Sequence, residues 1–330
     1  MQKDISEKQL ESLNDVFADI FNNLLFHGRK ILLEDNLVAL PTEAFTKNVD
    51  GSLRQGFRDI RKADKNLGIF RIIYQVENQE AVDNTMPERV MGYEYASYEE
   101  QIKSFMSQNS LTGNPAYAKR IHSSQLLAPV VTLVLYWGQE KWSSPLRLYD
   151  MLHFPPDIRD SLLPYVADYP MNLIQVSHLT EEQLGRLTSD FGLLAEFAVS
   201  RRQPDKLRKL MHDNQRIIRH PEEFLNALST VAGTSRYREM QGHIAEHLSG
   251  QKEKEGITMW SIEEELENKG FVRGRTEGKT EDILLLLEEL GPVPSHTAGR
   301  IRQERDPETL KRWLKTASRA HSMKEFIQNM

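Results

Sequence analysis

The stretch "APVVTLVLYWG" at residues 128–138 constrains the fold more than any other part of the sequence. Its apolar residues run almost without interruption up to Gly138. A strand with one face in water alternates apolar and polar residues, whereas a continuous apolar run predicts a β-strand covered on both faces. Such a strand belongs to a sheet between layers of helices, so the run indicates an α/β fold.

Patterns on both sides of this run predict the rest of that fold. Residues 7–26 and 85–106 have the spacing of helices, the second with Thr85 as its cap. Extended segments are predicted at residues 35–45, 53–62, 68–79 and 172–179. The polar stretch "ADKNL" at residues 63–67 predicts the turn between the two middle segments. From about residue 181 the pattern is helical almost throughout, so an α/β core precedes an α-helical C-terminal region.

The chain has 330 residues, more than one average domain needs. We expect a core domain at residues 1–180, a helical extension at 181–250, and a charged helix or hinge with a small helical unit at 251–330. In the last part, Asp306 is placed to cap a helix in which Trp313 packs the small bundle rather than stacking on a base. These C-terminal helices are a candidate surface for homo-oligomers.

Composition excludes several classes of function. The sequence has no cysteine, which excludes disulfides, thiolate zinc sites and cysteine nucleophiles. It has no apolar run of the ~18 residues that a membrane span needs, and its first residues lack the order of a signal peptide, so we expect a cytoplasmic protein without membrane partners. The histidines show no metal-binding spacing, and a P-loop is absent. The net charge of −6 argues weakly against a non-specific nucleic-acid coat, yet it allows a local basic groove.

The strand pattern "FRIIYQVENQE" at residues 70–80 ends in polar residues on one parity. Phe70, Ile72, Tyr74 and Val76 form the expected core face, while Glu77 and Gln79 share the opposite face. With a hairpin turn centred on Gly68, Asp59 would lie opposite Gln75 or Val76, next to Glu77.

Two carboxylates from neighbouring strands are the oxygen ligands that Mg²⁺ prefers, and such an ion activates water against a phosphodiester. The alternative is a pair of surface carboxylates, Asp59 and Glu77, that form ion pairs with nearby arginines (Arg58, Arg61 and Arg71). The pattern alone leaves both interpretations open.

A longer pattern surrounds these residues. It consists of Glu77-x-Gln79, then "MPER" at residues 86–89 at a helix start, then Tyr93 one turn on, and further downstream "PVVTLVLYWG". This pattern resembles the recombination-promoting nuclease / putative transposase family, within the PD-(D/E)XK nuclease superfamily. The resemblance implies an αβββαβ core with a mixed sheet and a metal-dependent DNA endonuclease linked to recombination or mobile elements.

Carried over by position, the resemblance implies that Asp59 and Glu77 hold Mg²⁺ or another divalent cation. Gln79 would occupy the position where most members of the superfamily have Lys, and would orient the water or contact the scissile phosphate. Arg89 is a candidate phosphate contact, or it pairs with Glu88 or Asp83.

Asp15 on the first helix is a weaker candidate for an extra metal ligand, or part of a solvated helix face. The rival to an enzyme is an inactive nuclease fold that binds DNA or a protein partner.

Overall fold

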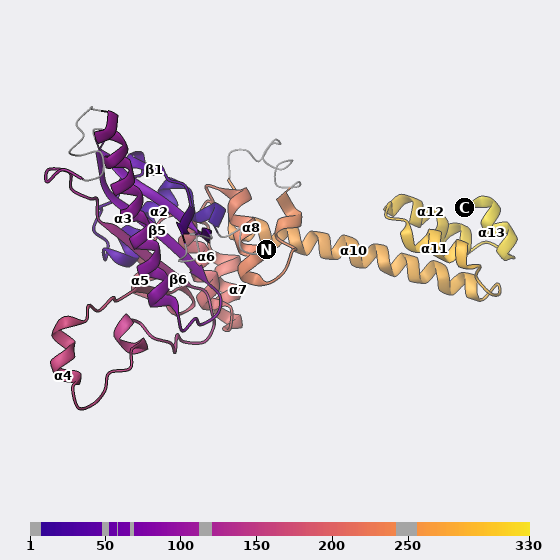
Figure 1. Ribbon diagram of the computed structural model, residues 1–330. Helices are drawn as coiled ribbons and strands as arrows, with labels where there is room; N and C mark the ends of the chain where they lie inside the picture. Colours follow the sequence, from indigo (N-terminus) through magenta and orange to yellow (C-terminus); the bar gives the residue numbers. More distant parts are fainter. Residues whose placement is uncertain (1–7, 48–52, 58, 67–68, 112–120, 242–255) are drawn as a thin grey trace. The chain divides into compact units, whose positions relative to one another are not determined.

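The computed structural model describes residues 8–47, 53–57, 59–66, 69–111, 121–241 and 256–330 (Figure 1). The chain divides into two compact units, Met1–Ile257 and Thr258–Met330. None of the described helices is long and apolar enough to cross a membrane.

A five-stranded mixed sheet forms the centre of the first unit, with the strand order β1-β4-β5-β6-β7. The strands are β1 (Leu37–Ala39), β4 (Ile60–Asn66), β5 (Ile69–Gln79), β6 (Val130–Tyr136) and β7 (Asn172–Gln175). The β1–β4 and β4–β5 pairs are antiparallel, and the β5–β6 and β6–β7 pairs are parallel. The predicted α/β class with a mixed sheet is therefore confirmed. A separate antiparallel pair joins β2 (Glu43–Lys47) to β3 (Leu53–Phe57).

The apolar run forms β6, and six of its seven residues are buried. Helix α3 (Met86–Leu111) covers one face of the sheet, where Gln75 donates a hydrogen bond of 2.6 Å to Ser97. Helix α2 (Asn14–Ile20) and the π-helix Phe21–Leu25 that follows it cover the other face, where the rings of Phe21 and Tyr74 lie 5.0 Å apart. The two-sided burial that the sequence predicted for this strand is confirmed.

The expected division of β5 into a core face and a polar face is wrong in part. Tyr74 and Val76 are buried as predicted, but Phe70 at the start of the strand is 40% exposed. Ile73, Gln75 and Glu77 on the opposite parity are also buried, because α3 packs over that face. Both faces of β5 thus contribute to the interior.

The turn predicted at "ADKNL" is wrong, because β4 continues through Asn66. Ala63 and Asp64 of that stretch are buried, and the ladder with β5 shifts register between Asp64 and Lys65. Asp64 Oδ2 pairs with Arg71 across the ladder at 3.5 Å, which offsets part of the cost of a buried charge inside the strand. The predicted turn centre, Gly68, lies outside the described residues.

The described residues after β7 form helices α5 (Glu181–Arg186), α6 (Asp190–Ser200), α7 (Pro204–Asp213) and α8 (Pro221–Ala232) in the first unit. Helix α6 is apolar on nearly all sides and packs against α2, α7 and α8. Short elements fill the connections: α4 (Arg159–Leu162) and the 3₁₀ helices Glu34–Asn36, Leu148–Met151, Leu163–Tyr165, Val176–His178 and Arg238–Met240.

The second unit is helical, with α10 (Met259–Glu288), α11 (Ser295–Gln303), α12 (Pro307–Ala317) and α13 (Met323–Asn329). Its core gathers Ile283, Leu287, Ile301, Leu310, Trp313, Ala317 and Phe326. Asp306 caps α12 by accepting from the backbone N–H groups of Glu308 and Thr309, as predicted. Trp313 is 2% exposed, so its predicted role in packing the bundle is confirmed.

Candidate functional site

Glu77 lies near the end of β5, beneath the first turns of α3, and is 3% exposed. Among the described residues, the hydrogen bonds to its carboxylate all fall on one oxygen. Oε1 accepts from Arg89 Nη2 at 2.5 Å, from Gln79 Nε2 at 3.3 Å and from the Tyr93 hydroxyl at 3.4 Å. The other oxygen, Oε2, is buried and has no hydrogen-bond partner among the described residues. A buried acceptor without a partner is costly, so Oε2 is a candidate ligand atom for a cation.

Asp59 lies directly before β4 and turns toward the end of β5. Its Oδ2 accepts from the backbone N–H of Asn78 at 2.7 Å, and its Oδ1 forms an ion pair with Lys8 Nζ at 2.7 Å. The register places Ile60 opposite Val76, so Asp59 stands at the level of Glu77. The structure therefore brings together the two carboxylates that the sequence singled out.

The neighbouring Asp59 affects the charge state of Glu77. Burial raises the pKa of Glu77 to about 8, and the negative charge of Asp59 adds to that rise, while Arg89 and Lys8 oppose it. Burial and the nearby Glu77 also raise the pKa of the Tyr93 hydroxyl. A pair of carboxylates that repel one another in a buried place is a setting in which added positive charge is favourable.

A second network holds the end of β5 from the other face of the sheet. Asn78 Nδ2 donates to Glu11 Oε2 at 2.6 Å, and Trp137 Nε1 donates to Asn78 Oδ1 at 2.8 Å. Glu11 is fully buried. These contacts fix the backbone between Glu77 and Gln79, so the site rests on a rigid strand end.

Sequence reasoning missed Lys8 and Glu11. The two residues are three positions apart on the predicted first helix, so they share a face. The one sequence feature that could have pointed to them is Glu11, an acidic residue next to Leu10 at the start of the apolar helix face.

Arg89 projects from the first turns of α3. Its Nη1 pairs with Asp83 Oδ2 at 2.7 Å, while its Nη2 reaches Glu77. Of the alternatives left open by the sequence, the pair with Asp83 is formed and a contact to Glu77 is added. Its side chain remains 30% exposed, so one edge of the guanidinium stays within reach of solvent.

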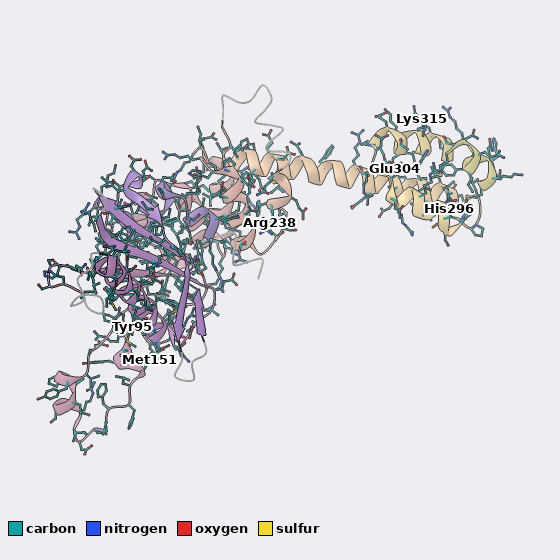
Figure 2. The ribbon with its side chains drawn as sticks, turned by 45° about the horizontal axis from the view of Figure 1, so that its top comes forward. Tyr95, Met151, Arg238, His296, Glu304 and Lys315 are labelled. Carbon is teal, nitrogen blue, oxygen red and sulfur yellow. The ribbon has the colours of Figure 1, made fainter. Side chains whose placement is uncertain are left out.

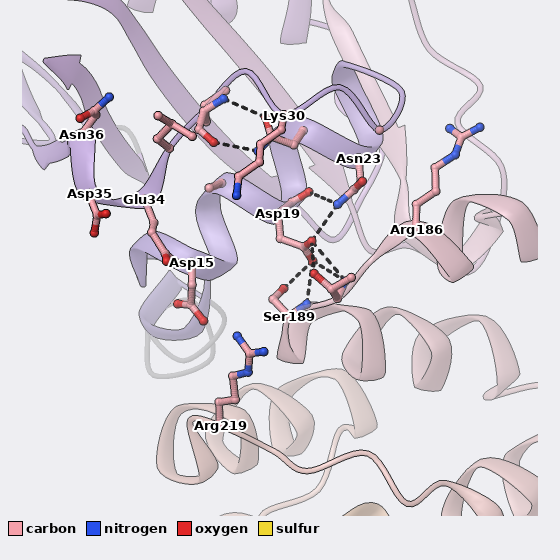
Figure 3. A pocket seen from close by; sticks show the side chains of 16 residues that line it. Asp15, Asp19, Asn23, Lys30, Glu34, Asp35, Asn36, Arg186, Ser189 and Arg219 are labelled. Atoms are coloured by element: carbon pink, nitrogen blue, oxygen red, sulfur yellow. Dashed lines mark hydrogen bonds between the residues drawn. The ribbon is translucent and has the colours of Figure 1, made fainter. Parts of the chain in front are cut away.

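Asp15, the weaker metal candidate, lies elsewhere. Its Oδ2 is 2.9 Å from His220 Nε2. Asp15 and Asp19 both line a cavity of about 540 Å³ (Figure 3). Asp19 accepts from Thr188 and Ser189 at the start of α6. Neither carboxylate makes a contact with Asp59 or Glu77 among the described residues.

Asp59 and Glu77 could hold a divalent cation if water and substrate phosphate supply its remaining ligands. Among the residues that the structure describes, no group of three or more His, Cys, Asp or Glu side chains could hold a metal. Mg²⁺, however, is often held by one or two carboxylates together with water and substrate phosphate. Glu77 Oε2 and the neighbouring Asp59 offer that smaller set of donors.

The comparison with protein families identifies the class of protein to which this fold and site belong. The family described as "Putative transposase, YhgA-like" matches residues 14–217, which include the whole sheet and helices α2 to α7. The chain belongs to this family, and the resemblance to a putative transposase family noted in the sequence is confirmed. The comparison with curated proteins and the comparison with solved structures each give no match.

Proposed function

We propose that the protein is a metal-dependent DNA endonuclease that hydrolyses phosphodiester bonds and acts in recombination or mobile-element biology. The observation that carries this proposal is the buried, unpartnered Oε2 of Glu77 beside Asp59 on the neighbouring strand. Membership of a transposase family supports DNA as the substrate. The order α2, β1, β4, β5, α3, β6 supports a PD-(D/E)XK core, since it reads αβββαβ once the β2–β3 pair is left aside.

In this proposal Asp59 and Glu77 would hold Mg²⁺ or a similar cation. When bound, the ion would polarise a water molecule and offset the negative charge of the phosphodiester. Gln79 is neutral and contacts Glu77 Oε1, so its amide can orient a water or a phosphate oxygen but cannot add charge.

Lys8 supplies the positive charge that Gln79 lacks. Its ammonium lies 2.7 Å from Asp59 and lowers the pKa of Glu77 by its charge. Arg89 is held between Glu77 and Asp83, where its exposed edge can meet a phosphate.

The test is nicking of supercoiled plasmid in Mg²⁺ and in Mn²⁺. Asp59→Ala and Glu77→Ala are each expected to lose at least about 100-fold in rate, in line with removal of a metal ligand, which costs several kcal/mol of transition-state stabilisation. Glu80→Ala is the matched control, because Glu80 is an exposed carboxylate directly after β5. Nicking that is unchanged in both site variants would contradict the proposal.

A second candidate is a nuclease fold that binds DNA or a protein without cutting. Arg89 and Gln79 both contact Glu77 Oε1, and this arrangement favours a site stabilised by its own side chains. Tight DNA binding with no cleavage by the wild type in Mg²⁺, Mn²⁺, Co²⁺ or Ca²⁺ would support this candidate. The cytoplasmic location and homo-oligomers through the C-terminal helices stay predictions.

A further inference from the structure

Three basic side chains lie along one side of α12 and the turn after it. Arg312, Lys315 and Arg319 are spaced by three and four residues, so they share one face, which we call the α12 basic face. All three are exposed, and Figure 2 labels Lys315 on the C-terminal helices. With Thr316, Ala320, Glu325 and Asn329 they line a concavity of about 470 Å³.

The opposite side of α12 holds this face in place. Leu310, Trp313 and Ala317 are buried in the core of the second unit. The position and direction of the basic side chains are therefore set by a packed helix rather than by a loop. Trp313 is turned inward, so it is not available to stack on a base.

The three side chains of the α12 basic face form no ion pair among the described residues. Arg312 acts at a distance on Asp306, whose pKa is lowered chiefly by its hydrogen bonds from Thr309. Glu325, the acidic residue of the concavity, accepts from the backbone N–H of His321 at 2.8 Å through Oε2.

Positive charge is concentrated in the last part of the sequence. Residues 295–330 hold eight Arg or Lys residues against four Asp or Glu residues, whereas the whole chain has a net charge of −6. A concentration of positive charge on an acidic chain is the electrostatic footprint of a polyanion partner.

We infer that the α12 basic face binds the phosphate backbone of duplex DNA, as a second contact outside the family region at residues 14–217. The choice of DNA rests on the proposed function, and the binding itself does not depend on Asp59 or Glu77. From Arg312 to Arg319 the helix advances about 10 Å at its rise of about 1.5 Å per residue. Phosphates of one strand advance about 3.4 Å each along the duplex, so the face matches about three of them. Contacts of this kind carry no sequence information.

The test uses the full chain in EDTA, so that no cleavage can occur, with two unrelated duplexes of about 30 base pairs and fluorescence anisotropy over about 50–200 mM salt. The triple variant Arg312→Gln, Lys315→Gln, Arg319→Gln keeps good helix formers at exposed positions, so the unit remains folded. It is expected to bind both duplexes at least about tenfold more weakly at about 100 mM salt, and to lower the slope of log K against log salt by about 3.

The matched control removes three exposed basic residues of α7: Lys206→Gln, Arg208→Gln, Lys209→Gln. It changes the net charge by the same amount and is expected to change the affinity less than about threefold. Equal loss in both variants, or no loss in the α12 variant, would overturn the inference.

Vesicles with and without phosphatidylserine form the second arm of the experiment. Loss of vesicle binding with unchanged DNA binding in the α12 variant would assign the face to anionic lipid instead and overturn the inference. Failure of the proposed function is recognised separately, because it appears as unchanged nicking by the Asp59 and Glu77 variants.

Discussion

The carboxylate of Asp19 joins the first helix of the core to the start of α6, and its removal gives a sharp prediction of stability. Asp19 is 8% exposed. It accepts from Ser189 N at 2.9 Å, Ser189 Oγ at 2.7 Å, Thr188 N at 3.0 Å and Asn23 Nδ2 at 2.7 Å (Figure 3). The contacts to Ser189 connect residues 170 positions apart in the sequence.

The size of the stability loss depends on which donors stay buried without a partner once the Asp19 carboxylate is removed. In Asp19→Ala, the donors of Thr188 return to solvent, because Thr188 is exposed. Ser189 is 3% exposed, so its N–H and hydroxyl stay buried and lose their partner. Each unpaired buried donor costs about 1–3 kcal/mol, so loss of the partner of these two donors is expected to lower the free energy of unfolding by about 2–6 kcal/mol.

The assay is urea unfolding followed by circular dichroism, with Asp15→Ala as the control on the same helix. Asp15 makes one part-exposed contact to His220, so its variant is expected to lose less than about 1 kcal/mol. An Asp19→Ala variant within about 0.5 kcal/mol of the Asp15→Ala variant would refute the reasoning, since the buried donors of Ser189 would then have found other partners.

Three further predictions concern separate parts of the chain. Lys8→Gln removes the ammonium beside Asp59 and is expected to slow plasmid nicking at least about tenfold in Mg²⁺; an unchanged rate would show that this charge is not used. Burial lowers the pKa of Lys62 to about 8 in the folded protein, although the charge of Asp15 opposes the shift. Above pH 8 the folded protein therefore loses the Lys62 proton while the unfolded chain keeps it, so the free energy of unfolding rises with pH. The rise between about pH 8 and 9.5, on the order of 1–2 kcal/mol in chemical unfolding after allowance for solvent screening, is expected to disappear in Lys62→Met, and its persistence would contradict the assignment. Gly274 lies inside α10 with open space where a Cβ would be added, so Gly274→Ala is expected to stabilise the helix by about 0.5–1 kcal/mol in thermal melting, and a loss of stability would indicate that this face is packed against another chain.

Local pattern was enough to predict the central elements of the fold. The apolar run of β6 and the helical spacing of α3 each depend on neighbouring residues, which is what periodicity measures. The end of β4 was mispredicted for the opposite reason. Asp64 looks like a turn residue in sequence, but it lies inside β4, where it pairs with Arg71 of the neighbouring strand β5.

In the candidate site, too, some residues could be predicted from local pattern and others are placed only by tertiary packing. Asp59 and Glu77 come together because a hairpin register can be estimated from the sequence. Lys8 and Glu11 could not be assigned, because their approach to Asp59 and Asn78 depends on how the first helix packs on the sheet. That packing is a tertiary contact with no periodic signal.

The central claim is that Asp59 and Glu77 together hold a divalent cation. Isothermal titration of the full chain with Mn²⁺ tests it most directly, with Glu77→Gln as the site variant and Glu80→Gln as the control at an exposed carboxylate. We predict Mn²⁺ binding to the wild type and to Glu80→Gln, with affinity at least about tenfold weaker in Glu77→Gln. Equal Mn²⁺ affinity in all three proteins would contradict the claim.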